Sequence, residues 1–133
     1  MCIFCKIIAG EIPADKVYED ESVLAFLDIS PINPGHTLVV PKKHYANLEE
    51  IPEKELFAIM AVVKIIGKSV KDSALAAGYN VGINNDPVAG QVVPHLHVHV
   101  IPRREHDGHA LWRGGKYEAG EAEKILGQLR ITN

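Results

Sequence analysis

Short runs of apolar residues, separated by polar turns, recur along most of this chain. Residues 17–20, 23–28 and 37–40 are rich in β-branched and aromatic side chains, which predicts a hairpin followed by a third strand. Residues 79–84 and 95–101 have the same character and predict two more strands. The pattern therefore predicts about five short strands.

One long segment, residues 53–77, departs from this pattern and predicts an amphipathic helix. Its apolar residues recur every three or four positions, at Leu56, Ile59, Met60, Val63, Ile66 and Val70. Gly67 weakens the helix propensity, and Gly78 predicts the C-terminal stop. Short helical segments are expected over residues 2–9 and 121–131. The expected fold is α+β, an antiparallel sheet of about five strands with one long helix and short terminal helices.

Length and charge narrow the class of protein. The 133 residues fit a single domain. A formal net charge of -3 leaves no large basic field, so we do not expect a nucleic acid as the main partner. Because no apolar run approaches the roughly 18 residues of a membrane span and the chain opens without an export signal, we expect a cytoplasmic protein with no membrane partner.

Residues 95–101 contain three histidines that alternate with apolar residues. In a strand, His95, His97 and His99 would share one face, and the residues between them would enter the core. Imidazole nitrogens need hydrogen-bond partners or solvent, so packing does not explain this row. An exposed polar face, a metal site and a catalytic nucleophile all fit the pattern. Histidine suits catalysis because its ordinary pKa, about 6.5, leaves it mostly neutral at cellular pH.

This histidine run resembles the signature of the histidine-triad (HIT) nucleotide-binding family, in its Hint-like and bacterial branch. Other segments also fall where that family has them, namely residues 2–8, 26–29 and 34–44, Asn84, and Gly90 with Gln91. The resemblance covers residues 2 to about 104. It therefore implies a single HIT domain over residues 1–133, with its core at 2–104 and a C-terminal tail at 105–133.

The resemblance also implies an activity. His97 would attack the α-phosphate of a nucleotide and form a covalent nucleotidyl-histidine, and His99 would contact the phosphate or the leaving group. His36 would hold the catalytic ring from beneath, although a satisfied core histidine is the alternative. The implied enzyme is a hydrolase of purine nucleoside phosphoramidates with an AMP-type ligand. A dinucleoside polyphosphate hydrolase and a non-catalytic nucleotide- or zinc-binding module are the alternatives.

A wider set of residues would hold the nucleotide. By resemblance it consists of Asp28, Ile29, Asn84, Gly90, Gln91, Val92, His97 and His99. Asp28 would accept hydrogen bonds from the ribose hydroxyls. Taken alone, without the resemblance, it is better explained as a strand-end or cap residue. Val92 departs from the family, because many members have a hydroxyl residue there and a valine side chain cannot donate to phosphate.

Cys2 and Cys5 have the spacing of half a tetrahedral zinc site. Some bacterial members complete such a site with the histidines that correspond to His44 and His95, which implies a structural zinc ion. Thiolate and imidazole ligands favour zinc over oxygen-preferring cations. The alternative is a pair of reduced cysteines near a frayed terminus.

The family usually forms homodimers, so a homodimer is expected here. Trp112 would reach the partner's nucleotide site or, alternatively, would pin the tail to the body together with Tyr117. His106 and His109 receive no role.

Overall fold

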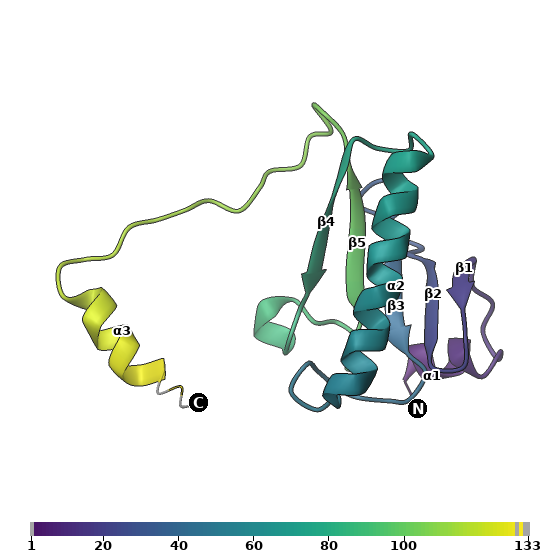
Figure 1. Cartoon of the computed structure of the whole chain (residues 1–133), viewed down its shortest axis with the longest axis horizontal. Helices are drawn as coiled ribbons and strands as arrows, with labels where there is room; N and C mark the ends of the chain where they lie inside the picture. The colour runs from purple at the N-terminus through teal and green to yellow at the C-terminus, as the bar shows by residue number, and fades with distance from the viewer. Residues whose placement is uncertain (1, 130, 132–133) are drawn as a thin grey trace.

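The computed structural model describes residues 2–129 and 131, which form a five-stranded antiparallel sheet crossed by one long helix (Figure 1). The strands are β1 (Lys16–Glu19), β2 (Val23–Leu27), β3 (Thr37–Pro41), β4 (Gly78–Ile83) and β5 (Val98–Arg103). They lie in the order β1-β2-β3-β5-β4, and every neighbouring pair is antiparallel. The predicted α+β fold is confirmed, and it places β5 between β3 and β4.

Helix α2 (Glu53–Asp72) covers one face of the sheet, as Figure 1 shows. It buries Ile59, Val62, Val63, Ile66 and Val70, most of them against valines and an alanine of β2, β3 and β5. The predicted stripe is correct except that Met60 is exposed and Val62 takes a buried position. Met60 follows the buried Ile59 by one residue, about 100° around the helix, and so lies on its flank.

The helix ends earlier than predicted, at Asp72 rather than at residue 77. Ser73 closes the last turn, and Ala74 adopts a left-handed conformation with φ 58° that turns the chain out of the helix. Gly78 is therefore the first residue of β4 and not the helix stop. Gly67 also has a packing reason, because a Cβ atom there would overlap the Tyr79 ring.

The short helix α1 (Ile3–Ile8) lies against the opposite face of the sheet. Phe4 and Ile7 pack there with the side chains of Leu24, Phe26, Leu38 and Val40. His99 pairs with Leu38 across the sheet and therefore projects toward the same face as α1. The candidate site thus lies between α1 and β5, on the side of the sheet away from α2.

Strand β5 begins later than predicted, at Val98 rather than at residue 95. The Leu96 N–H donates to the carbonyl of Tyr45 at 2.7 Å instead of joining the sheet, so the chain before Val98 is irregular. Strand alternation consequently applies to His99 but not to His95 or His97. The predicted burial of Leu96, Val98 and Val100 on the α2 side is nevertheless confirmed.

The tail leaves the end of β5 and runs away from the sheet to α3 (Glu121–Leu129) (Figure 1). None of the nine residues of α3 is buried. Trp112 is 99 % exposed and Tyr117 is also exposed, so the prediction that they pin the tail to the body is wrong for this chain. Residue 130, inside the predicted terminal helix, lies outside the described residues. Within the part of the chain described, no helix is both long and apolar enough to cross a membrane.

Candidate active site

The rings of His95, His97 and His99 come together beside α1. The centroids of the His97 and His99 rings are 4.9 Å apart. Phe4 of α1 presents its ring to two of them, at 5.1 Å from His97 and 5.9 Å from His95. Packing against Phe4, rather than strand alternation, therefore gathers the irregular part of the histidine run on this face.

His97 is held as a neutral imidazole with one defined tautomer. Its Nδ1 atom lies 2.7 Å from the carbonyl oxygen of His95. A carbonyl oxygen only accepts, so Nδ1 carries the hydrogen and Nε2 keeps its lone pair. Burial lowers the pKa of His97, although its bond to the His95 carbonyl and the Asp28 charge oppose that effect. His97 thus offers an unprotonated nitrogen at neutral pH.

A second hydrogen-bonded chain fixes His99. The Ile32 N–H donates to His36 Nδ1 at 3.1 Å, so the hydrogen of the His36 ring lies on Nε2. That Nε2 lies 2.9 Å from His99 Nδ1 and donates to it. The hydrogen of His99 is therefore on Nε2, a buried atom with no hydrogen-bond partner among residues 2–129 and 131. Burial, with His97 and His36 nearby, lowers the pKa of His99 to about 4.

Asp28 is the carboxylate of this cluster. One oxygen lies 3.8 Å from His36 Nε2, and the other accepts the Ser30 N–H at 2.8 Å. Its charge opposes the lowering of the pKa of His36, which burial dominates. The neighbouring Ile29 is exposed beside it. The Oδ2 atom of Asp28 therefore takes no part in the hydrogen bond between Asp28 and Ser30.

The loop after β4 brings Asn84, Gly90, Gln91 and Val92 together. Gly90 has φ 95°, a conformation that favours glycine, and its carbonyl accepts from Asn84 Nδ2 at 3.5 Å. The Gln91 amide is used inside the protein, since it accepts the Asp86 N–H at 2.8 Å and donates to the Ala46 carbonyl at 2.6 Å. Val92 is 89 % exposed. Gln91 thus shapes this loop from within.

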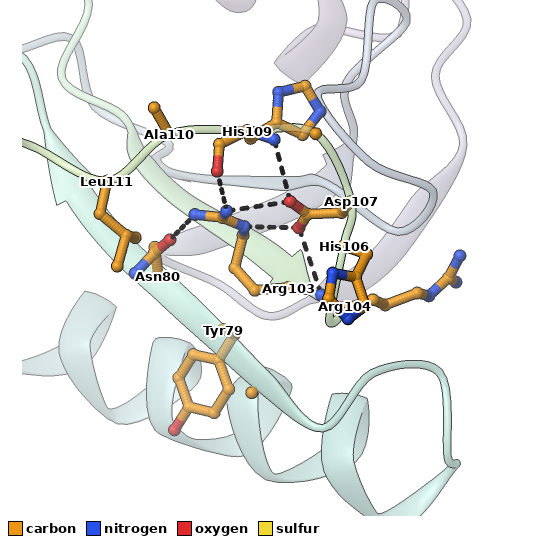
Figure 2. Close-up of a pocket in the computed structure, with 11 residues that line it drawn as sticks. Tyr79, Asn80, Arg103, Arg104, His106, Asp107, His109, Ala110 and Leu111 are labelled. Carbon is orange, nitrogen blue, oxygen red and sulfur yellow. Dashed lines mark hydrogen bonds and ion pairs between the residues drawn. The ribbon is translucent and has the colours of Figure 1, made fainter.

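Three hollows border this region, and two of them lie beside the start of the tail. One of about 620 Å³ lies between β4 and the start of the tail, with Asn84, His99 and Trp112 in its lining. The other, of about 680 Å³, lies over Arg103 and Asp107 (Figure 2). Although the second is larger, the Arg103 guanidinium already uses four of its five N–H groups within the protein. The first, which has His99 in its lining, fits the chemistry of the site better.

Four potential metal ligands converge near the start of α1, and they are Cys2, Cys5, His44 and His95. Their two Sγ and two Nδ1 atoms lie 3.1 to 3.6 Å apart in all six pairings. Six nearly equal distances are the edges of a tetrahedron, the arrangement that zinc takes with two thiolates and two imidazoles. The sequence-predicted metal residues are therefore brought together.

The electronic state of these donors also fits a cation. His95 Nε2 donates to the Pro41 carbonyl at 2.9 Å, which leaves the Nδ1 lone pair pointing into the cluster. Burial, with the adjacent Cys2 thiol, raises the pKa of Cys5, so a thiolate there needs a positive charge close by. The donor atoms of Cys2, Cys5, His44 and His95 therefore fit a zinc ion in both geometry and chemistry.

The sheet with its clustered histidines has the architecture of the histidine-triad class. The chain belongs to the HIT domain family, whose family model matches residues 9–106. An uncharacterised HIT-like protein of Methanocaldococcus jannaschii is 51 % identical over 130 residues, 98 % of this chain and 99 % of that protein.

Two further relatives have names that state an activity. Adenosine 5'-monophosphoramidase HNT1 of Candida albicans is 44 % identical over 132 residues, covering 96 % of this chain and 86 % of that protein. Adenylylsulfatase HINT3 of Arabidopsis thaliana is 43 % identical over 111 residues, covering 84 % of this chain and 55 % of that protein.

Solved structures agree on the fold. A HIT family protein from Bacillus subtilis superposes with a TM-score of 0.88 at 41 % identity, covering 99 % of this chain and 98 % of that one. A zinc-bound histidine triad family protein from Mycobacterium smegmatis superposes with a TM-score of 0.78 at 38 % identity, covering 96 % and 94 %.

Proposed function

We propose that this protein is a hydrolase that cleaves nucleotides at the α-phosphorus through a covalent His97 intermediate, with purine nucleoside phosphoramidates as substrates. The observation that carries the proposal is the 2.7 Å hydrogen bond from His97 Nδ1 to the His95 carbonyl, which leaves Nε2 unprotonated. The monophosphoramidase from Candida albicans supports the substrate class.

The reaction has two displacements at phosphorus. His97 Nε2 forms a bond to the α-phosphorus while the bond from phosphorus to the amine nitrogen breaks. The amine takes that electron pair and leaves with a proton from solvent. A water oxygen then attacks the phosphorus, the electron pair of the P–N bond returns to His97, and the water proton goes to solvent. The products are a nucleoside monophosphate, here AMP, and an amine.

His99 donates to a phosphate oxygen in this scheme. Because its pKa is lowered to about 4, the ring is neutral at pH 7 and acts as a hydrogen-bond donor rather than as a protonated general acid. Its buried Nε2–H has no partner among the described residues, and a phosphate oxygen seated against His99 would supply the acceptor as charge develops in the transition state. His36 positions His99 through their 2.9 Å contact.

The positions of the other residues support the remaining nucleotide contacts that the family resemblance implies. Asp28 would accept from the ribose hydroxyls, with Ile29 exposed beside the base. Asn84 and the backbone of the loop at Gly90 and Val92 would line the phosphate. Gln91 supports that loop from within.

We also propose that Cys2, Cys5, His44 and His95 hold a zinc ion. All four ligands come from the protein, so the ion would be structural and would tie α1 to the segment that carries the histidines. The zinc-bound protein from Mycobacterium smegmatis supports this assignment.

A homodimer completes the proposal. Strand β4 is an edge of the sheet, and Phe57 and Ile65 of α2 are exposed apolar side chains. The tail, with Trp112 fully accessible, is free to reach a second copy near its nucleotide site. Sedimentation velocity tests this part, and a monomer at micromolar concentration would contradict it.

The activity is tested by AMP release from adenosine monophosphoramidate, with diadenosine tetraphosphate and adenosine 5'-phosphosulfate run in parallel. We expect the phosphoramidate to give the highest kcat/KM and His97→Ala to abolish its turnover. Rapid quenching and intact mass measurement should detect a nucleotidyl adduct on wild-type protein and none on the variant. Preference for the tetraphosphate or the phosphosulfate would change the substrate, whereas AMP binding without turnover of any of them would overturn the hydrolase.

A further inference from the structure

The carboxylate of Asp107, at the start of the tail, receives hydrogen bonds from five donors. The Arg103 guanidinium supplies two, at 2.7 and 3.0 Å, and the backbone N–H groups of Arg104 and His109 supply two more, at 3.2 and 3.0 Å (Figure 2). Asn33 Nδ2 supplies the fifth at 3.0 Å. With Arg103 as the largest cause, these donors hold the pKa of Asp107 well below its usual range. Asp107 is therefore ionised, and its two oxygens form a junction at which five hydrogen bonds meet.

This junction reaches the turn before His36 along two routes. Asn33 also donates to the carbonyl of Pro102 at 2.8 Å, so its side chain joins the turn to the end of β5. His109, whose backbone is held by Asp107 and by Arg103, donates from Nε2 to the carbonyl of Ile32 at 3.0 Å. Asp107 thus restrains residues 32 and 33 through Asn33 and His109.

The same two residues hold His36. Ile32 donates its N–H to His36 Nδ1 at 3.1 Å, and the Asn33 carbonyl accepts the His36 N–H at 3.0 Å. The Ile32 N–H lies in the peptide unit before Ile32, and the carbonyl that His109 binds lies in the unit after it. The Ile32 backbone that joins the two units therefore orients the ring that fixes His99. If this backbone turned away, His36 Nδ1 would lose its donor, and either nitrogen of the ring could carry the hydrogen.

We infer that Asp107 is a positioning residue for the reaction: through His109 and Asn33 it holds the backbone on both sides of Ile32 so that His36 keeps the Nε2–H of His99 directed at the phosphate. Asp107 acts through other residues and does not itself touch the substrate. The role in catalysis rests on the proposed function, but the control of the His99 tautomer does not.

The test compares Asp107→Asn and His109→Ala with His109→Gln, which keeps an N–H donor. Arg104→Ala is the matched control, because it removes another bond of the tail, from Arg104 Nε to the Leu75 carbonyl at 2.9 Å, that lies off this route. Long-range ¹H–¹⁵N spectra of the histidine rings report each tautomer without substrate. Kinetics with adenosine monophosphoramidate supply kcat and KM.

We expect His99 to be the Nε2–H tautomer in wild type, Arg104→Ala and His109→Gln, and a mixture in Asp107→Asn and His109→Ala. In the last two, kcat should fall about tenfold while KM changes little, as for other supporting hydrogen bonds behind a functional imidazole. Unchanged His99 resonances and kcat in both, with only a lower unfolding temperature, would overturn the inference. If wild type hydrolyses no nucleotide, the proposed function fails, and the spectra alone still decide whether Asp107 sets the His99 tautomer.

Discussion

The Nδ1 atom of His97 lies 2.7 Å from the backbone oxygen of His95, and the side chain of that same His95 belongs to the cluster of Cys2, Cys5, His44 and His95 that could hold a metal ion. One residue therefore orients the proposed nucleophile with its carbonyl and closes the cysteine–histidine cluster with its ring. The peptide unit that carries this carbonyl has a second anchor, the bond from the Leu96 N–H to the Tyr45 carbonyl at 2.7 Å, so release of the His95 ring would loosen the carbonyl without freeing it.

Removal of the metal should consequently alter His97, the proposed nucleophile. After chelation, or in Cys5→Ser, we expect a lower unfolding temperature, a mixed His97 tautomer in histidine ¹H–¹⁵N spectra, and a kcat reduced about tenfold. Chelator should have no further effect on Cys5→Ser. A uniform His97 tautomer in metal-free, folded protein would show that the cluster and the nucleophile are independent.

Phe4 is a second link between α1 and the nucleophile. Its ring meets His97 edge to face, at 5.1 Å and 83°, and meets Phe26 at 5.5 Å. Phe4→Leu should cost about 1 kcal/mol of stability because the volume is nearly kept. It should also lower kcat about threefold, since an aromatic pair contributes roughly 0.5–1.5 kcal/mol beyond its buried area.

Phe26→Leu is the control for that measurement. Phe26 is as buried as Phe4 and touches its ring, but it has no ring contact with a described histidine. Urea denaturation should give a similar loss of stability for the two variants, with kcat reduced only in Phe4→Leu. Equal kcat values in the two variants would show that Phe4 contributes only to the core and not to the position of His97.

The sequence predicted those parts of the fold that depend on local patterns. The helical stripe from Ile59 to Val70 and the strand runs identify their elements because burial repeats with the period of each element. The predicted end of α2, at residue 77, was wrong because Ala74 adopts a left-handed conformation that an alanine in the sequence does not indicate. The start of β5 was wrong because Leu96 bonds to Tyr45, which lies 51 residues earlier in the chain.

The candidate site divides in the same way. The histidine pattern and the pair of cysteines are visible in the sequence, and the structure adds the tautomers of His97 and His99, which depend on carbonyl and amide groups brought from elsewhere in the fold. His109 received no role because its partner, the Ile32 carbonyl, is set by tertiary structure. A charged pair, formed by Arg103 at the end of β5 and Asp107 four residues later, was a local sign of the network that holds His109.

Gly67 makes a close contact between α2 and β4 possible, and this is testable by a double-mutant cycle. Gly67→Ala should destabilise the protein by about 2 kcal/mol, because the new methyl group overlaps the Tyr79 ring. Much of that loss should disappear when Gly67→Ala is made in Tyr79→Ala, which empties the space. Gly127→Ala in α3, where a methyl group meets nothing within 4 Å, should leave the unfolding free energy unchanged or slightly higher. Additive effects at residues 67 and 79 would contradict the proposed overlap.

Acid should destabilise the protein partly through His99. Burial lowers the pKa of His99 from 6.5 to about 4, so unfolding takes up a proton between these two pH values. This contribution to stability is complete above pH 6.5 and is lost progressively as the pH falls toward 4. His99→Asn removes the group, so its unfolding free energy should depend less steeply on pH, by at most about 1.4 kcal/mol per pH unit. Urea denaturation of both proteins, each without metal so that proton release by the cluster cancels, measures the difference. Parallel pH profiles of wild type and variant would mean that His99 is protonated as readily in the folded chain as in the unfolded one.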